Sequence, residues 1–123
     1  MRVGTDICEV SRFADKVDDI KFLNRVFTKK ERAHIETLNV KQARMERMAG
    51  KFCAKEAVLK LLGTGLDKGI KWLDIEILPD ENGKPCVVFS GMALKIKENL
   101  KIKEIELSIS HTATMAMAVC ASN

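Results

Sequence analysis

The apolar residues of this sequence change their period near residue 70, and that change limits the folds available to the chain. Between residues 40 and 62, apolar side chains recur at steps of three and four, which is the spacing of one helical face. Beyond Ile70 the pattern alternates, and Leu73, Ile75 and Ile77 share one face of an extended segment. A chain that is mainly helical first and mainly extended afterwards is typical of an α+β domain with an antiparallel sheet.

Turn and capping signals predict the remaining elements. Residues 2–10 predict a first strand, Ser11 is a candidate N-cap for a helical segment, and Thr28 with Glu31 has the spacing of a capping box. Asn82-Gly83 predicts a hairpin turn. Further strands are expected at residues 86–90, 105–110 and 115–120, and a short amphipathic helix at residues 91–100. No repeat or linker interrupts the chain, so we expect one domain, residues 1–123, with its sheet packed against the long helix.

Composition excludes several classes of protein. Hydrophobic residues make up 46% of the chain and charged residues 31%, which argues against disorder. No apolar run approaches the roughly 20 residues of a membrane span, and the first residues lack a signal-peptide pattern, so we expect a cytoplasmic protein without a membrane partner. The four cysteines contain no C-x-x-C pair, and we interpret them as small packing residues: Cys8, Cys53, Cys86 and Cys120.

Positive charge is concentrated in one part of the chain. Residues 21–60 carry 11 Lys or Arg against 4 Glu, a local balance of +7, whereas the whole chain has a net charge of +4. Such a concentration favours an anionic partner, although a solvated helical face explains it equally well. A small basic nucleic-acid-binding domain is therefore an alternative function. Its strands, however, lack the aromatic residues that stack on single-stranded bases, so we expect no nucleic-acid partner.

One carboxylate falls on the apolar face of the long helix. Glu56 either forms a surface ion pair with Lys60, four residues on, or belongs to a site. Asp6 lies inside the first predicted strand, although aspartate is a poor strand former. If that strand packs on the helix, Asp6 and Glu56 could meet around a hard divalent cation such as Mg²⁺, and Lys60 could reach the same phosphates. His111, at a strand end, is either functional or a hydrogen-bonded turn residue.

Five segments together resemble one known family: VGTDICEV, FTKKE, GKFCAKEAVLKLLGTG, DIEI…NGKP and LSISHT. The chain resembles the holo-acyl-carrier-protein synthases, the small trimeric class of 4′-phosphopantetheinyl transferases, over essentially its whole length. The early G-x-D-I strand and the F-x-A-K-E-A…K helix are specific as a pair. The resemblance implies a 4′-phosphopantetheinyl transferase-like fold that assembles as a homotrimer, with active sites formed between subunits.

The resemblance also implies a role for individual residues. Asp6 and Glu56 are expected to hold Mg²⁺ together with the pyrophosphate of coenzyme A, and Arg12 to dock the acidic carrier protein. Residues expected to bind coenzyme A are Arg44, Lys51, Lys60, Gly63, Thr64, Gly65, Pro85 and His111, of which Arg44 and Lys51 are expected to serve a neighbouring subunit's ligand. Lys51 stands where the motif usually has arginine, which keeps the charge but loses bidentate phosphate geometry.

The implied reaction transfers 4′-phosphopantetheine from coenzyme A to a serine of apo-acyl carrier protein and releases adenosine 3′,5′-bisphosphate. It would support fatty acid biosynthesis. Mg²⁺ and Lys60 are expected to stabilise the charge that develops on the pyrophosphate. The serine proton would pass to Glu56 directly or to a metal-bound water, and the sequence leaves both routes open.

Overall fold

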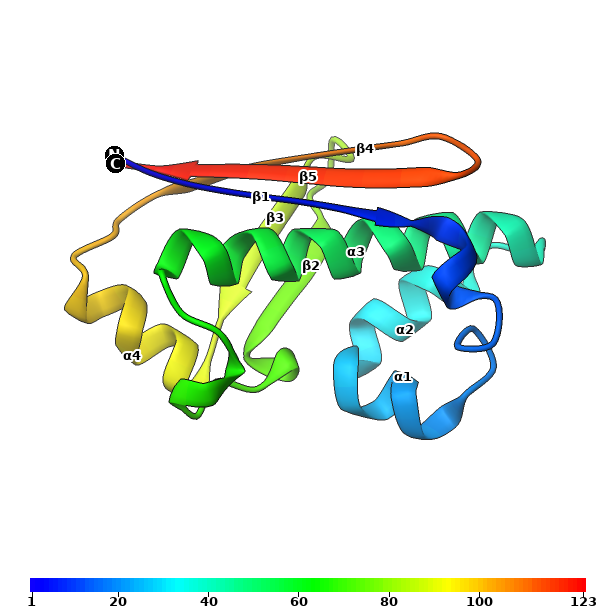
Figure 1. The fold of residues 1–123 in the computed structure, drawn as a ribbon, viewed down its shortest axis with the longest axis horizontal. Helices are drawn as coiled ribbons and strands as arrows, with labels where there is room; N and C mark the ends of the chain where they lie inside the picture. The colour runs from blue at the N-terminus through cyan, green and yellow to red at the C-terminus, as the bar shows by residue number, and fades with distance from the viewer.

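Two antiparallel sheets and one long helix form the framework of the molecule (Figure 1). The computed structural model describes residues 1–123. The first sheet has the order β1-β5-β4, built from β1 (Arg2–Glu9), β5 (Met115–Ser122) and β4 (Ile105–His111). The second pairs β2 (Ile75–Pro79) with β3 (Pro85–Phe89). The α+β class and the antiparallel pairing are therefore confirmed, and the predicted hairpin at Asn82-Gly83 joins β2 to β3.

Helix α3 (Lys41–Leu62) lies along one face of the three-stranded sheet, with β1 directly over it (Figure 1). Gly4 makes this close approach possible, because a Cβ atom there would lie only 1.9 Å from the carbonyl oxygen of Ala57. Gly4 and Cys8 are buried on the helix side, whereas Val3 and Ile7 point away and are 59% and 65% exposed. The alternation of the strand places Asp6 on the helix side as well.

The shorter helices form a second layer beneath α3 (Figure 1). Residues around Ser11 form a 3-10 turn, Val10–Phe13, and Ser11 caps no helix. Helix α1 (Ile20–Val26) begins instead after Asp19, whose side chain accepts a hydrogen bond from the Phe22 amide. Helix α2 (Lys29–Glu36) begins with the predicted capping box of Thr28 and Glu31.

The C-terminal half differs from the sequence-based expectation at one position. Leu73 lies in a 3-10 turn, Trp72–Asp74, so the prediction that it shares a strand face with Ile75 and Ile77 is wrong. Another 3-10 turn occupies Leu66–Lys68, and helix α4 spans Gly91–Asn99. None of the helices combines the length and the apolar composition that a membrane span requires.

A buried ion pair connects three of these elements. Lys55 of α3 and Glu31 of α2 are both fully buried, and their charged atoms are 2.8 Å apart. The Lys55 ammonium also donates to the carbonyl oxygens of Trp72 and Ile75, and Glu31 accepts from the amides of Thr28 and Ile77. A buried charge pair is tolerated only when its remaining hydrogen bonds are satisfied, as they are here. The network fixes the rotation of α3 at the residue next to Glu56.

Candidate active site

Two carboxylates from distant parts of the sequence meet where β1 crosses α3. Asp6 lies on β1 and Glu56 on α3, and the Lys60 ammonium is 3.3 Å from Asp6 Oδ1. Burial raises the pKa of Glu56, and the nearby Asp6 carboxylate raises it further, while Lys60 and Arg12 oppose this shift. The structure thus brings together the acids and the lysine that the sequence suggested. We call Asp6, Glu56 and Lys60 the carboxylate cluster.

The carboxylate cluster fits a hard divalent cation. Mg²⁺ typically binds one or two carboxylates and completes its octahedron with waters and phosphate oxygens. The chain has no group of three or more His, Cys, Asp or Glu side chains placed to enclose a metal. The Asp6 carboxylate adds to the burial that raises the pKa of Glu56, and Lys60 opposes this shift only in part. Asp6 and Glu56 are therefore the residues that would hold Mg²⁺, with coordination positions left for a phosphate ligand.

The end of α3 places a glycine loop beside the carboxylate cluster. Gly63 closes the helix in the left-handed conformation, with φ of 76°, and its amide donates to the carbonyl of Lys60. The Thr64 amide donates to the carbonyl of Leu59, which completes a Schellman-type cap. Gly63 and Gly65 are exposed, and Thr64 is half-buried. Three residues expected near coenzyme A thus follow directly after the turn that carries Lys60.

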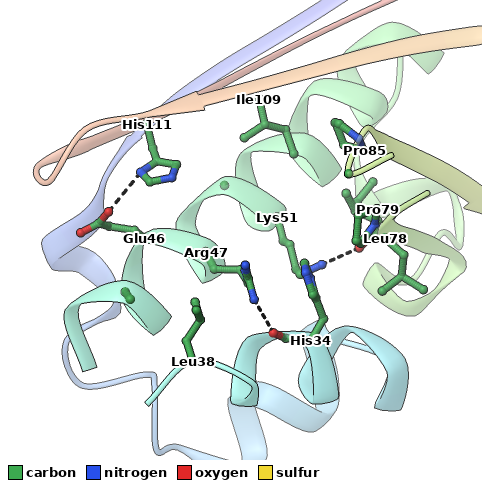
Figure 2. A pocket seen from close by; sticks show the side chains of 14 residues that line it. His34, Leu38, Glu46, Arg47, Lys51, Leu78, Pro79, Pro85, Ile109 and His111 are labelled. Carbon is green, nitrogen blue, oxygen red and sulfur yellow. Dashed lines mark hydrogen bonds and ion pairs between the residues drawn. The ribbon is translucent and has the colours of Figure 1, made fainter. Parts of the chain in front are cut away.

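A separate cavity of about 450 Å³ opens between α3, the β2–β3 hairpin and β4 (Figure 2). It contains three of the predicted coenzyme A-binding residues, namely Lys51, Pro85 and His111. His111 Nδ1 lies 3.2 Å from the Glu46 carboxylate. No residue of the carboxylate cluster lines this cavity, so the candidate site of one chain consists of two separate parts.

The cavity wall is of mixed character, and two basic side chains, Arg47 and Lys51, belong to it together with the acidic Glu46. Lys51 is almost fully buried, its ammonium donates to the carbonyl oxygen of Ile77 at 2.7 Å, and burial lowers its pKa to about 8. Burial also lowers the pKa of His34 to about 4, with Lys51 and Arg47 adding to the effect. With its pKa near 4, His34 is neutral at pH 7, so the positive charge of the cavity comes from Arg47 and Lys51, and it favours an anionic ligand.

Arg47 is the cavity residue that sequence reasoning missed. Its guanidinium donates to the His34 carbonyl at 2.7 Å (Figure 2). The signal was present, because Arg47 precedes Lys51 by four residues and therefore lies on a neighbouring part of the same helical face. Arg44, which is expected to serve a neighbouring subunit's ligand, does not line this cavity; it donates to the Leu38 carbonyl and lines a different pocket, with Asp18 and Arg32.

Arg12 stands at the edge of the carboxylate cluster. It follows β1 in the Val10–Phe13 turn and is exposed. Its guanidinium carbon lies 5.8 Å from the ring centre of Phe13 and 5.3 Å from that of Phe52. Stacking on two rings orients the charge without neutralising it, which leaves Arg12 available to an acidic partner.

Comparison of the sequence with known proteins gives one consistent result. Residues 2–120 match the sequence model of the 4′-phosphopantetheinyl transferase superfamily. The holo-[acyl-carrier-protein] synthase of Thermoanaerobacter sp. (strain X514) is 48% identical over 117 residues, which cover 94% of this chain and 82% of that protein. The corresponding synthase of Caldanaerobacter subterraneus subsp. tengcongensis is 50% identical over 118 residues, covering 95% of this chain and 90% of the relative.

Solved structures give the same result at the level of the fold. A holo-(acyl-carrier-protein) synthase from Bacillus anthracis, crystallised in complex with CoA (3′,5′-ADP), is 35% identical with a TM-score of 0.81; the match covers 98% of this chain and 94% of that one. The Helicobacter pylori synthase in complex with coenzyme A is 28% identical with a TM-score of 0.83, and the match covers 98% and 99% of the two chains. The arrangement of β1 over α3 is thus part of a fold shared along nearly the whole chain.

Proposed function

The chain belongs to the 4′-phosphopantetheinyl transferase superfamily, and we propose that it transfers 4′-phosphopantetheine from coenzyme A to a serine of apo-acyl carrier protein. Adenosine 3′,5′-bisphosphate is the second product, and the reaction supports fatty acid biosynthesis in the cytoplasm. The observation that carries this proposal is the meeting of Asp6, Glu56 and Lys60 where β1 crosses α3. Relatives 48% and 50% identical to the chain carry the name of this activity.

Each residue of the carboxylate cluster has its own role in the proposed reaction. Bound Mg²⁺ would neutralise negative charge on the pyrophosphate of coenzyme A, with Asp6 and Glu56 as its protein ligands. The Lys60 side chain is 56% exposed, so its ammonium can reach a phosphate oxygen as the bond to the leaving phosphate breaks. Glu56 would accept the proton of the serine hydroxyl, either directly or through a bound water.

A complete site requires more than one subunit in this proposal. The cavity that contains Lys51 and His111 shares no residue with the carboxylate cluster. A ligand that uses both parts would therefore bridge two chains. The outer face of the three-stranded sheet offers a contact surface: Val3, Ile7, Met117 and Val119 are between 39% and 65% exposed. Exposed apolar patches of this kind usually mark protein interfaces. We propose that this face joins three copies of the chain.

The acidic carrier protein would dock beside the carboxylate cluster. Arg12 projects an oriented positive charge there, and a basic surface increases the rate of encounter with an acidic protein. The nucleic-acid alternative gains no support, because two of the basic residues between positions 21 and 60, Lys51 and Lys55, are buried rather than displayed.

The test is to mix the protein with apo-acyl carrier protein, coenzyme A and Mg²⁺ and to weigh the carrier by mass spectrometry. The expected result is a gain equal to one phosphopantetheine, absent with EDTA and absent in Glu56→Gln. An unchanged carrier mass with a folded, coenzyme A-binding protein would refute the proposed acceptor. A gain that persists with EDTA would refute the proposed role of the metal.

A further inference from the structure

Cys8 and Cys53 form a close pair of thiols that the proposed reaction does not use. Both are free cysteines, and their sulfur atoms lie 2.9 Å apart although 45 residues separate them in sequence. Cys8 is 5% exposed and Cys53 is fully buried. The other two cysteines form no such pair, since Cys86 is exposed and Cys120 is buried elsewhere in the core.

The pair lies beside the carboxylate cluster. Cys8 follows Asp6 by two residues on β1, and Cys53 precedes Glu56 by three residues on α3. Each thiol also donates to a backbone carbonyl, that of Ala49 for Cys8 and that of Ala116 for Cys53, and the Asp6 carboxylate lies close enough to act on both thiols. At a separation of 2.9 Å the two sulfurs are in direct contact, with no side chain between them.

We propose that Cys8 and Cys53 are an oxidisable pair, which a peroxide converts into a disulfide within the folded protein. A disulfide bond is about 2.0 Å long, so the sulfurs need to approach by only about 1 Å. The resulting bond would connect the strand that carries Asp6 to the helix that carries Glu56. The chemistry of the pair is independent of the proposed transferase function, whereas its effect on the carboxylate cluster rests on that function.

The oxidation balances in two steps with hydrogen peroxide as the oxidant. The Cys8 sulfur attacks one peroxide oxygen, the O–O bond breaks, and the thiol proton leaves with the second oxygen as water. This gives a sulfenic acid on Cys8. The Cys53 sulfur then attacks the Cys8 sulfur and displaces the hydroxyl group, which takes up the Cys53 proton and leaves as a second water. Each sulfur gives up one electron, and one peroxide is reduced to two waters.

In this proposal the peroxide oxidises Cys8 first. Residue Cys8 is 5% exposed and lies near the half-buried Glu56, whereas Cys53 is fully buried. Hydrogen peroxide is close to water in size and can enter where larger thiol reagents cannot. Formation of the sulfenic acid at Cys8, followed by attack from Cys53, is therefore the order that the burial of the two residues supports.

The test uses the full chain with Cys86→Ser, which removes the exposed thiol that could link two molecules. The folded protein is treated with hydrogen peroxide, the remaining thiols are alkylated under denaturing conditions, and the peptides are mapped. The expected product lacks the mass of two hydrogen atoms, contains a linked peptide pair with Cys8 and Cys53, and leaves only Cys120 alkylated. Because the bond closes a long loop between β1 and α3, we expect the melting temperature to rise by roughly 5–10 °C. Reduction with dithiothreitol should bring it back to its original value.

The matched control is Cys53→Ala in the same background, which should show neither the linked peptide nor the reversible rise in melting temperature. Three results would overturn the proposal: both thiols alkylated after peroxide treatment, separate sulfinic acids on the two residues, or a link that forms only in denaturant. None of these readouts depends on transferase activity. Failure of the disulfide to form would therefore leave the proposed transferase function unaffected, and absence of transferase activity would leave the disulfide proposal unaffected.

Discussion

Lys51 shows how burial changes the chemistry of one side chain. It is 4% exposed, hydrogen-bonded to the Ile77 carbonyl, and its pKa is lowered to about 8 because the charged form is poorly solvated. An arginine at the same position would stay charged at every accessible pH. The charge that Lys51 offers to an anionic ligand is therefore pH-dependent in a way that the arginine usual in this motif would not be.

We predict that Lys51→Arg flattens the pH dependence of the KM for coenzyme A. With a folded-state pKa of about 8, the lysine is charged below that pH and loses its charge as the pH rises through it. The KM of the unmodified enzyme should therefore rise between pH 7.5 and 9.5, by roughly tenfold if one phosphate contact depends on Lys51. Superimposable KM profiles for the two proteins would show that Lys51 does not contact the ligand.

Replacing Arg12 should affect the KM for one substrate and not that for the other. Arg12→Glu should raise the apparent KM for the carrier protein by roughly tenfold and leave that for coenzyme A nearly unchanged, because the reversal repels an acidic partner at the edge of the site. Lys103→Glu is the matched control: this exposed lysine lies between α4 and β4 and, unlike Arg12, is not among the charges that act on Glu56, so it should change neither constant. Equal effects of Arg12→Glu on both substrates would count against docking.

At the level of the elements, the contact between β1 and α3 creates the site. Gly4 allows the strand to lie on the helix backbone, and the Lys55–Glu31 network fixes the helix from its opposite side. A side chain at position 4 would move the whole strand outward, and Asp6 two residues further would move with it.

Gly4→Ala should therefore reduce both stability and turnover. Its Cβ would clash with the Ala57 carbonyl, so we expect the free energy of unfolding to fall by about 3 kcal/mol in urea denaturation. Gly83→Ala is the control: nothing lies within 4 Å of its Cβ, and only its left-handed backbone should cost about 1 kcal/mol. A loss no larger at Gly4 than at Gly83 would contradict the close approach.

The elements also show how far sequence reasoning extends. Signals that depend on neighbouring residues were predictable: the capping box at Thr28, the helix end at Gly63 and the hairpin turn. Contacts made through space were not. The burial of Lys55 depends on the partner that α2 supplies, and the direction of Arg44 depends on the loop carbonyl of Leu38. Asp6 and Glu56 were suggested because each is unusual where it stands, but only the fold brings them together.

For the whole molecule, the outer face of the three-stranded sheet is the feature that a single chain leaves without a function, because it exposes apolar side chains to water. Ile7 on β1 and Met117 on β5 are paired in register and both exposed. Burying such a face between copies would stabilise an assembly by about 25 cal/mol for each Å² of apolar surface removed from water.

Ile7→Glu should convert the proposed trimer into monomers, because three carboxylates would be placed in an apolar interface. Light scattering coupled to size-exclusion chromatography gives the mass directly. Val88→Glu, at a position 56% exposed on β3 of the other sheet, should leave the assembly intact. A monomer before any substitution, or a trimer insensitive to Ile7→Glu, would refute this interface.

The most direct test of the central claim is calorimetric titration of coenzyme A into the protein, with Mg²⁺ or with EDTA. If Asp6 and Glu56 hold a cation that receives the pyrophosphate, binding will be tight with Mg²⁺ and weaker by roughly tenfold or more with EDTA. Asp6→Asn and Glu56→Gln should show the weaker binding even when Mg²⁺ is present. Equal affinity under all four conditions would contradict the account.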